Sequence, residues 1–174
     1  MKRFRIVPVL SAFAFLLMLA GISRADNSAL PGHYVYVPER SASVEQAVEK
    51  TVAEVSFVLR PIARSRLNKT NRPYQNITLS TSGGKASITT DKRAAIVAPV
   101  DGKPIQWKRE DGEVMDVSLQ WQGRALQETI AADDGRRVNL FELSPDGNEL
   151  RMLVTVSSKR LPKPLVYTLV YQRQ

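Results

Sequence analysis

The feature that most limits the fold of this chain is a series of closely spaced turn sequences after residue 80. The turns are Ser82-Gly83-Gly84, Asp101-Gly102, Asp111-Gly112, Gln122-Gly123, Asp134-Gly135 and Pro145-Asp146-Gly147. Asp and Gly accept the positive φ angles of tight β-turns, so each pair typically ends one strand and begins its neighbour. The segments between the turns are too short for the crossover that a parallel neighbour requires. The sequence therefore predicts an antiparallel meander.

The segments between these turns alternate between apolar and polar residues, which is the period of a β-strand. The predicted strands cover residues 32–38, 74–81, 85–90, 94–98, 104–109, 114–121, 124–132, 137–143, 148–157 and 165–172. A meander of this many strands usually curls into a barrel or a half-barrel, because curling protects the edge strands from pairing with other chains. The expected fold class is mainly β (α+β), in one domain over residues 26–174.

Between the first two predicted strands, the pattern is helical instead. Ser43 and Gln46 have the spacing of a capping box, and apolar residues then recur at three- and four-residue intervals. We predict one amphipathic helix over about residues 43–68, with its apolar face packed on the sheet. Pro61 is expected either to kink this helix or to begin a second one. A lid or membrane-facing role is the alternative for this helix.

The first 25 residues have the pattern of a signal peptide. Basic residues precede an apolar run over residues 6–22, and the small residues Ser23 and Ala25 follow at the spacing that a signal peptidase requires. We predict cleavage after Ala25 and a periplasmic or secreted location; a membrane anchor is the alternative. Because the chain has no cysteine, it cannot be a lipoprotein with a lipid-modified N-terminal cysteine. No later stretch is long and apolar enough to span a bilayer.

The net charge of the chain depends strongly on whether the signal peptide is cleaved. Cleavage would remove four of the 25 basic residues and none of the 17 acidic ones, lowering the formal net charge from +8 to +4. We therefore expect no nucleic-acid partner, although the full chain is strongly basic. A weak contact with an anionic surface is expected at most, through Arg60, Arg64, Arg66 and Lys69. The alternative is that these cations form a solvated helix end, where the helix dipole favours them.

Little in the sequence supports catalysis. His33 is the only histidine, and no Gly-x-Ser-x-Gly motif supplies a nucleophile for a Ser-His-acid triad. The absence of cysteine excludes thiol catalysis and cysteine-ligated metals, and no Asp-x-Asp-x-Asp loop suggests calcium. Glu128 and Glu142 belong to no recognisable pair of catalytic carboxylates. The sequence predicts no enzyme, no cofactor and no metal site.

The residues expected on the inner surface of the sheet include large aromatic side chains and three charged ones. Glu128, Glu142 and Arg109 all fall in the apolar register of their strands. Because an inward carboxylate is costly unless it is paired, such a group indicates an ion pair or a ligand site. Glu142 and Arg109 lie near strand ends and also fit a barrel rim, whereas a register error is the alternative for Glu128. The predicted ligand-binding residues are Trp107, Trp121, Glu128, Tyr167, Tyr171 and Arg109.

The export signal, the Gly32-x-Tyr34 opening of the first strand, the meandering hairpins and the aromatic-rich last strand together resemble lipocalin-type (calycin) proteins. Lipocalins open with Gly-x-Trp and carry their main helix near the C-terminus, so Tyr34 and the early helix depart from that pattern. The segment from Arg60 to Tyr74 also resembles small exported bacterial proteins. The lipocalin resemblance implies a cavity that carries a small apolar molecule, although a fold alone does not determine function.

Three functions are consistent with the sequence. The first is an exported soluble protein that holds a small apolar or lipid-like ligand in a curved β-sheet. The second is an envelope interaction or assembly module with a filled core and no ligand. An enzyme of unknown class is the third.

Overall fold

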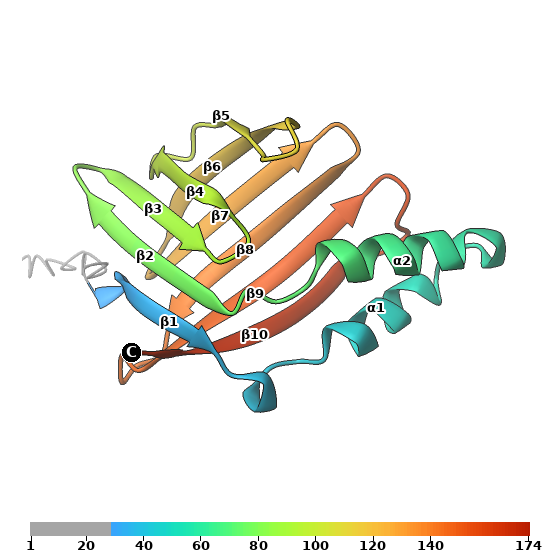
Figure 1. Ribbon diagram of the computed structural model, residues 1–174, viewed down its shortest axis with the longest axis horizontal. Coiled ribbons are helices and arrows are strands. Elements are labelled where there is room, and N and C mark those ends of the chain that lie inside the picture. Colours follow the sequence, from blue (N-terminus) through green and yellow to red (C-terminus); the bar gives the residue numbers. More distant parts are fainter. Residues whose placement is uncertain (1–28) are drawn as a thin grey trace, which may run out of the picture.

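The computed structural model describes residues 29–174, so the predicted signal peptide lies outside the described residues. The described part contains ten strands and two helices arranged as a barrel with the helices at one end (Figure 1). The strands are β1 (Gly32–Tyr36), β2 (Asn76–Ser82), β3 (Lys85–Thr90), β4 (Arg93–Pro99), β5 (Ile105–Lys108), β6 (Val114–Gln122), β7 (Ala125–Ala132), β8 (Gly135–Leu143), β9 (Glu149–Ser158) and β10 (Leu165–Arg173).

All ten strands form one antiparallel sheet in the order β4-β3-β2-β1-β10-β9-β8-β7-β6-β5. β1 pairs with both β2 and β10, which joins the first and last strands of the chain in the middle of the sheet. The two edge strands, β4 and β5, are not paired with each other. β4 nevertheless lies against β6, and Asp101 just after β4 forms a bridge to Gln120 in β6. The sheet is therefore a nearly closed barrel, as predicted.

The turn chemistry explains why the strands begin and end where they do. Gly83 and Gly84 between β2 and β3 have φ angles of +57° and +75°, values that residues with a Cβ rarely adopt. Two consecutive positive φ angles make the turn that matches the twist of adjacent antiparallel strands. β3 covers the predicted residues, and the other strand boundaries lie within a few residues of the predicted ones.

The predicted helical segment forms two helices, α1 (Val44–Val52) and α2 (Arg60–Thr70). Ser43 caps α1, because its hydroxyl accepts a hydrogen bond from the backbone N–H of Gln46 at 3.2 Å. Pro61 lies in the first turn of α2, where its missing N–H costs no hydrogen bond. The expected single helix over residues 43–68 is therefore two helices. Pro61 lies at the beginning of the second helix, which is one of the two outcomes expected for it. Neither helix is long and apolar enough to cross a bilayer.

The turn between the two helices is held together by one arginine. The Arg60 side chain donates from Nε to the carbonyl of Val55 at 2.9 Å and from Nη2 to that of Ala53 at 2.8 Å. These carbonyls belong to the end of α1 and the segment after it, where backbone acceptors have no partner within the helix. Arg60 thus links the start of α2 to the end of α1.

The apolar core fills the barrel below the helices. Several side chains from the inner faces of β6, β7, β9 and β10 have no more than 1% of their surface exposed, namely Leu119, Leu126, Met152, Val154 and Leu169. A side chain this buried borders no space large enough for water, so the barrel is packed with side chains at this depth. The lipocalin resemblance implied a cavity for an apolar molecule; the space available to a ligand lies near the helices.

Candidate functional site

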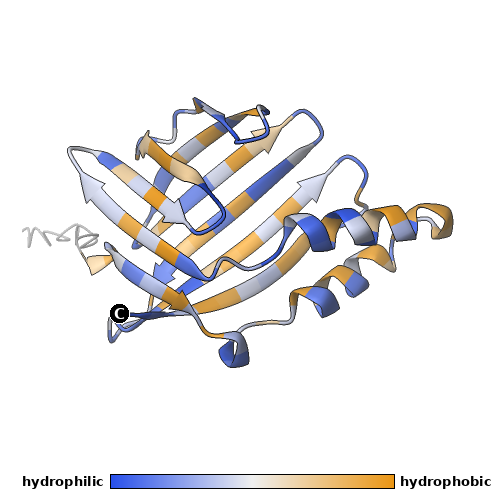
Figure 2. Cartoon of the chain, in the orientation of Figure 1, coloured by the Kyte–Doolittle hydropathy of each residue, from blue (hydrophilic) through white to orange (hydrophobic). Residues whose placement is uncertain are grey.

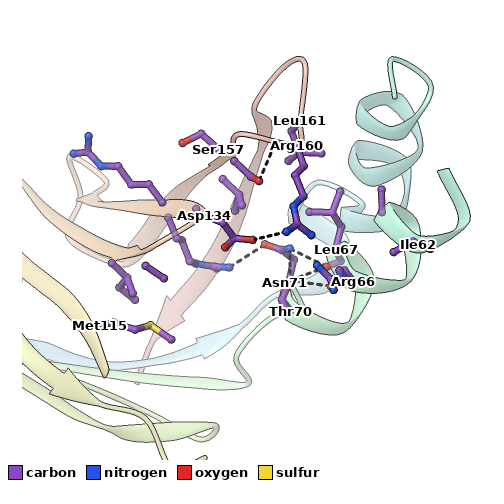
Figure 3. Close-up of a pocket in the computed structure, with 18 of the residues that line it drawn as sticks. Ile62, Arg66, Leu67, Thr70, Asn71, Met115, Asp134, Ser157, Arg160 and Leu161 are labelled. Carbon is purple, nitrogen blue, oxygen red and sulfur yellow. Dashed lines mark hydrogen bonds and ion pairs between the residues drawn. The ribbon is translucent and has the colours of Figure 1, made fainter. Parts of the chain in front are cut away.

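A cavity of about 570 Å³ opens at the mouth of the barrel, between α2 and the ends of the strands. Leu59, Ile62, Ala63 and Leu67 line it from the helical side. Met115, Ile130 and Val156 line it from β6, β7 and β9. Figure 3 shows Met115 on the strand side of this space and Ile62 and Leu67 on the helix side. We call this space the mouth cavity; its walls suit an apolar group.

A second cavity of about 420 Å³ lies beside the mouth cavity and is strongly basic. Thr70, Arg109 and Arg137 line both cavities, so the two spaces adjoin. We call the second space the basic lobe. The cationic side chains that line it are Lys69, Arg72, Lys92, Arg93, Arg109 and Arg137, and the acidic ones are Glu110 and Asp111.

A buried ion pair lies inside the barrel beside the basic lobe. Glu128 in β7 is completely buried, and its Oε1 accepts a hydrogen bond from Nη2 of Arg93 at 2.6 Å. The guanidinium of Arg93 also lies over the ring of Tyr74, 5.3 Å from its centre. Burial is the largest single influence on the pKa of Arg93 and acts to lower it, but the charge and the hydrogen bond of Glu128, together with Tyr74, outweigh burial, so the pKa of Arg93 is raised. An inward carboxylate was expected to indicate either an ion pair or a ligand site, and Glu128 forms an ion pair with Arg93.

The ion pair continues into a chain of hydrogen bonds that reaches the end of α2. Asn139 donates to the second carboxylate oxygen of Glu128 at 2.6 Å and accepts from Nε of Arg137 at 2.9 Å. Arg137 then donates to the side-chain oxygen of Asn71 at 2.9 Å, and the Tyr167 hydroxyl donates to the same oxygen at 3.1 Å. Asn71 is the C-cap of α2, so these bonds tie the helix to the barrel wall.

Arg137 is a half-buried cation that lines both cavities, and it has no ion-pair partner among residues 29–174. Its hydrogen-bond partners, Asn139, Asn71 and Tyr167, are all uncharged. The sequence analysis did not identify Arg137, because it expected the residues of β8 that alternate with Arg137, among them Glu142, to face the interior. Arg137, Asn139 and Phe141 point inward, whereas Glu142 is exposed, which corrects the expectation that Glu142 lies in the inner register. A shift of one residue exchanges the two faces of a strand.

Two further donors in this region have no hydrogen-bond partner within residues 29–174. They are Nε of Arg93 and the hydroxyl of Tyr171, both buried. Burial raises the pKa of Tyr171 well above its usual value, and the nearby rings of Tyr74 and Tyr36 add to this effect. Tyr171 therefore stays a neutral donor. Buried donors without partners are rare in folded proteins, so an acceptor from water or a ligand would complete this region.

The other sequence-predicted site residues are distributed over the barrel. Trp107 is buried and lines the basic lobe, and Tyr167 contributes its hydroxyl to the network described above. Arg109 lines both cavities at the rim, where it pairs with Asp111 and Glu113, in agreement with the rim interpretation. Trp121 borders a separate hollow next to the β2–β3 turn. Ligand contact by these residues stays a prediction.

The basic run at the second helix divides into two groups. Arg60 holds the turn between the helices, and Arg64 forms two hydrogen bonds with Glu49, at 2.6 and 2.8 Å. The hydrogen bonds from Arg64 lower the pKa of Glu49. Arg66 lines the mouth cavity and Lys69 lines the basic lobe. Among residues 29–174, no cluster of three His, Cys, Asp or Glu side chains could hold a metal ion.

Sequence comparison and structural comparison give different results for this chain. No family model and no curated protein matches the sequence. Among solved structures, the REP1-NXSQ fatty acid transporter is similar over 84% of this chain and 97% of its own, with 16% identity and a TM-score of 0.55. A fatty acid binding protein of Schistosoma mansoni in complex with arachidonic acid has the same coverage and identity, with a TM-score of 0.53.

Fatty-acid-binding protein 1 of Echinococcus granulosus is similar over 84% of this chain and 98% of its own, at 14% identity and a TM-score of 0.52. At such identities the likeness concerns the fold alone. The ten strands differ in number from the eight of a lipocalin barrel, so the lipocalin resemblance is not confirmed. Residues 29–174 thus have the calycin-type barrel fold that these fatty-acid-binding structures share.

Proposed function

We propose that this chain is an exported, non-catalytic carrier of an amphipathic molecule with an acidic group. The apolar part of the ligand would lie in the mouth cavity, and its acidic group would bind Arg137. The observation that carries this proposal is the position of Arg137, a half-buried arginine without an ion-pair partner in residues 29–174, in the wall of a cavity whose lining is mainly apolar. An anion there would form charge-assisted hydrogen bonds with the guanidinium, which are stronger than those of its present neutral partners.

The packing of the barrel and the likeness to carrier structures support the same proposal. Side chains fill the barrel at depth, so the mouth is where a ligand finds space. Structures described as a fatty acid transporter and as fatty acid binding proteins have a similar barrel. We therefore choose dodecanoate, a simple amphipathic carboxylate, as the first probe. Titration calorimetry below its micellar concentration should give saturable binding with one site per chain.

The variant Ala63→Trp should abolish most of this binding without unfolding the protein. Ala63 is a half-buried residue of α2 that lines the mouth cavity, so a tryptophan there would occupy the space that the apolar chain needs. We expect the affinity for dodecanoate to fall by at least about tenfold, because the displaced chain loses the burial of several methylene groups at roughly 0.8 kcal/mol each. Calorimetry measures the affinity, and circular dichroism verifies the fold.

Ser80→Trp is the matched control for Ala63→Trp. Ser80 is exposed on β2, away from both cavities, so the same added bulk should leave dodecanoate binding unchanged. If wild-type protein binds no dodecanoate and yields no lipid by mass spectrometry after native purification, the carrier proposal is wrong. The assembly module with a filled core would then be the better explanation, and a stable envelope partner would support it.

Export is the part of this proposal that rests on the N-terminal sequence. The basic start, the apolar run over residues 6–22 and the Ser23-x-Ala25 end support cleavage after Ala25. N-terminal sequencing of protein from an envelope fraction should begin at Asp26. An intact N-terminus in a membrane pellet would favour the anchor instead.

The outer end of the helix pair supports a second element of the proposal, contact with an anionic membrane. Phe57 and Val58 are 80% and 78% exposed, and Leu59 and Ile62 are also more than half exposed. Figure 2 shows hydrophobic residues at this end of the helix pair. Arg60 and Arg66 follow in the sequence and would add attraction to an anionic surface, whereas Arg64 is paired with Glu49 and Lys69 lies in the last turn of α2. Leu59 and Ile62 also line the mouth cavity, so a ligand could pass between the bilayer and the cavity there.

The double variant Phe57→Ser/Val58→Ser should weaken binding to vesicles. We expect at least about a tenfold loss on vesicles that contain phosphatidylglycerol, since burial of a large apolar side chain contributes about 1.5–3 kcal/mol. Co-sedimentation measures binding, with Val97→Ser as the control because Val97 is an exposed valine on β4. Equal binding of all three proteins would contradict membrane contact through this surface, and equal binding to neutral phosphatidylcholine vesicles would contradict its preference for an anionic membrane.

A further inference from the structure

The basic lobe holds more positive charge than a carboxylate requires. Six cationic side chains line it against two acidic ones. Arg93 is neutralised by Glu128, and Arg109 by Asp111 and Glu113. The cations that remain form no ion pair within residues 29–174, and they are Lys69, Arg72, Lys92 and Arg137.

These four cations come from three separate parts of the chain. Lys69 lies at the end of α2 and Arg72 follows it, Lys92 lies in the turn between β3 and β4, and Arg137 lies in β8. Lys92 is held in place by a hydrogen bond from Nζ to the carbonyl of Pro73 at 2.6 Å. The fold thus gathers cations that the sequence separates by up to 68 positions, from Lys69 to Arg137. Like charges repel, so this arrangement is expected to attract an anion of more than one charge.

The basic lobe is also correctly placed to receive the polar end of a molecule in the mouth cavity. Thr70, Arg109 and Arg137 line both spaces, so the two cavities meet at these side chains. A phosphate monoester carries about −1.5 to −2 charges at neutral pH and offers three acceptor oxygens, whereas a carboxylate carries one charge and two oxygens. A phosphate therefore matches a site with several free cations better than a carboxylate does.

We propose that the basic lobe binds the phosphate group of a phosphate-bearing amphiphile, whose apolar chain lies in the mouth cavity. This inference rests on the proposed carrier function and narrows it from acidic amphiphiles in general to those with a phosphorylated head group. It differs from the fatty acids named for the structurally similar proteins, because it depends on the cations of this chain.

The test compares dodecyl phosphate with dodecanoate, which share the same apolar chain, and with inorganic phosphate, which has none. Titration calorimetry in a phosphate-free buffer near neutral pH and at low salt gives the three affinities. We expect dodecyl phosphate to bind at least about tenfold more tightly than dodecanoate, because the phosphate can form an additional charge-assisted hydrogen bond with these cations. Inorganic phosphate should bind much more weakly than dodecyl phosphate, because it leaves the mouth cavity empty.

The triple variant Lys69→Gln/Arg72→Gln/Lys92→Gln should remove this preference. These residues are exposed and form no ion pairs within residues 29–174, so the fold should tolerate their neutralisation. We expect the affinity for dodecyl phosphate to fall at least about tenfold and that for dodecanoate by no more than about threefold, because the carboxylate depends mainly on Arg137. The control Lys85→Gln/Arg124→Gln removes two exposed cations outside both cavities, one at the start of β3 and one in the β6–β7 turn, and should change neither affinity.

The outcomes separate this inference from the carrier proposal. If no amphiphile binds the wild-type protein, both are wrong. If dodecanoate binds as tightly as dodecyl phosphate, or if the triple variant keeps the preference for phosphate, the phosphate site is wrong while the carrier function stands. Inorganic phosphate binding as tightly as dodecyl phosphate would show a site for free phosphate and would overturn the amphiphile proposed here.

Discussion

Glu128→Ala should lower the free energy of unfolding by about 3–5 kcal/mol, because it leaves a buried guanidinium without its partner. Glu128 is completely buried and pairs with Arg93 at 2.6 Å. The substitution also removes the acceptor for Asn139, which is completely buried as well. Urea unfolding followed by tryptophan fluorescence measures the effect.

Two further variants show whether the loss comes from the ion pair. Glu142→Ala removes an exposed glutamate from β8, and a surface substitution of this kind should change stability by no more than about 0.5 kcal/mol. Arg93→Met/Glu128→Gln removes both charges and keeps an acceptor for Asn139, so it should recover much of the stability, because an isolated buried charge no longer remains. If Glu128→Ala is as stable as Glu142→Ala, the buried pair does not stabilise the barrel.

Arg137→Gln should weaken dodecanoate binding by about 10- to 100-fold, because hydrogen bonds to a charged group contribute about 1.5–3 kcal/mol. Arg137 is one of five arginines that line the mouth cavity, and within residues 29–174 its hydrogen-bond partners are all uncharged, so its charge is available to a ligand. Calorimetry at several salt concentrations measures the affinity. The wild-type affinity should fall as salt rises, and the variant should have lost most of this dependence.

Arg137 also has a structural role, since it joins Asn139 to Asn71, so the binding result needs variants that separate the two roles. Arg137→Lys keeps the charge but cannot form the same set of hydrogen bonds, and it should retain more of the binding than Arg137→Gln. Arg124→Gln removes an exposed cation from the β6–β7 turn and should bind dodecanoate like the wild type. Unchanged binding by Arg137→Gln would show that the acidic group of the ligand lies elsewhere.

Local residue patterns were sufficient to predict most of the fold. The paired glycines at 83–84 and the Asp-Gly turns determine where hairpins form, because only a few residue types adopt the backbone angles of those turns. The capping residue Ser43 and the proline at 61 mark the starts of the two helices. Alternation then identifies the strands, and their short connections require antiparallel neighbours.

The candidate site was predicted only in part. Glu128 was expected to face inward because it lies in mid-strand between Leu126 and Ile130, and it does. Its partner Arg93 was not identified, and β8 was assigned to the wrong face. Val138 and Leu140 are more apolar than Arg137 and Asn139. Hydropathy alone therefore favours the assignment in which Val138, Leu140 and Glu142 face the interior. Asn139 is tolerated in the interior because Glu128 and Arg137 satisfy its hydrogen bonds.

The sequence by itself thus determined the meander, its turns and the helical segment between the first two strands, because these depend on interactions within a few residues. Only the tertiary structure decided that the barrel is packed at depth, that the space for a ligand lies under α2, and that Arg137 faces it without an ion-pair partner in residues 29–174. These features depend on pairs such as Arg93 with Glu128 and Arg137 with Asn71, which lie 35 and 66 positions apart. Whether a buried polar group is tolerated depends on partners that only the folded chain brings within hydrogen-bonding distance.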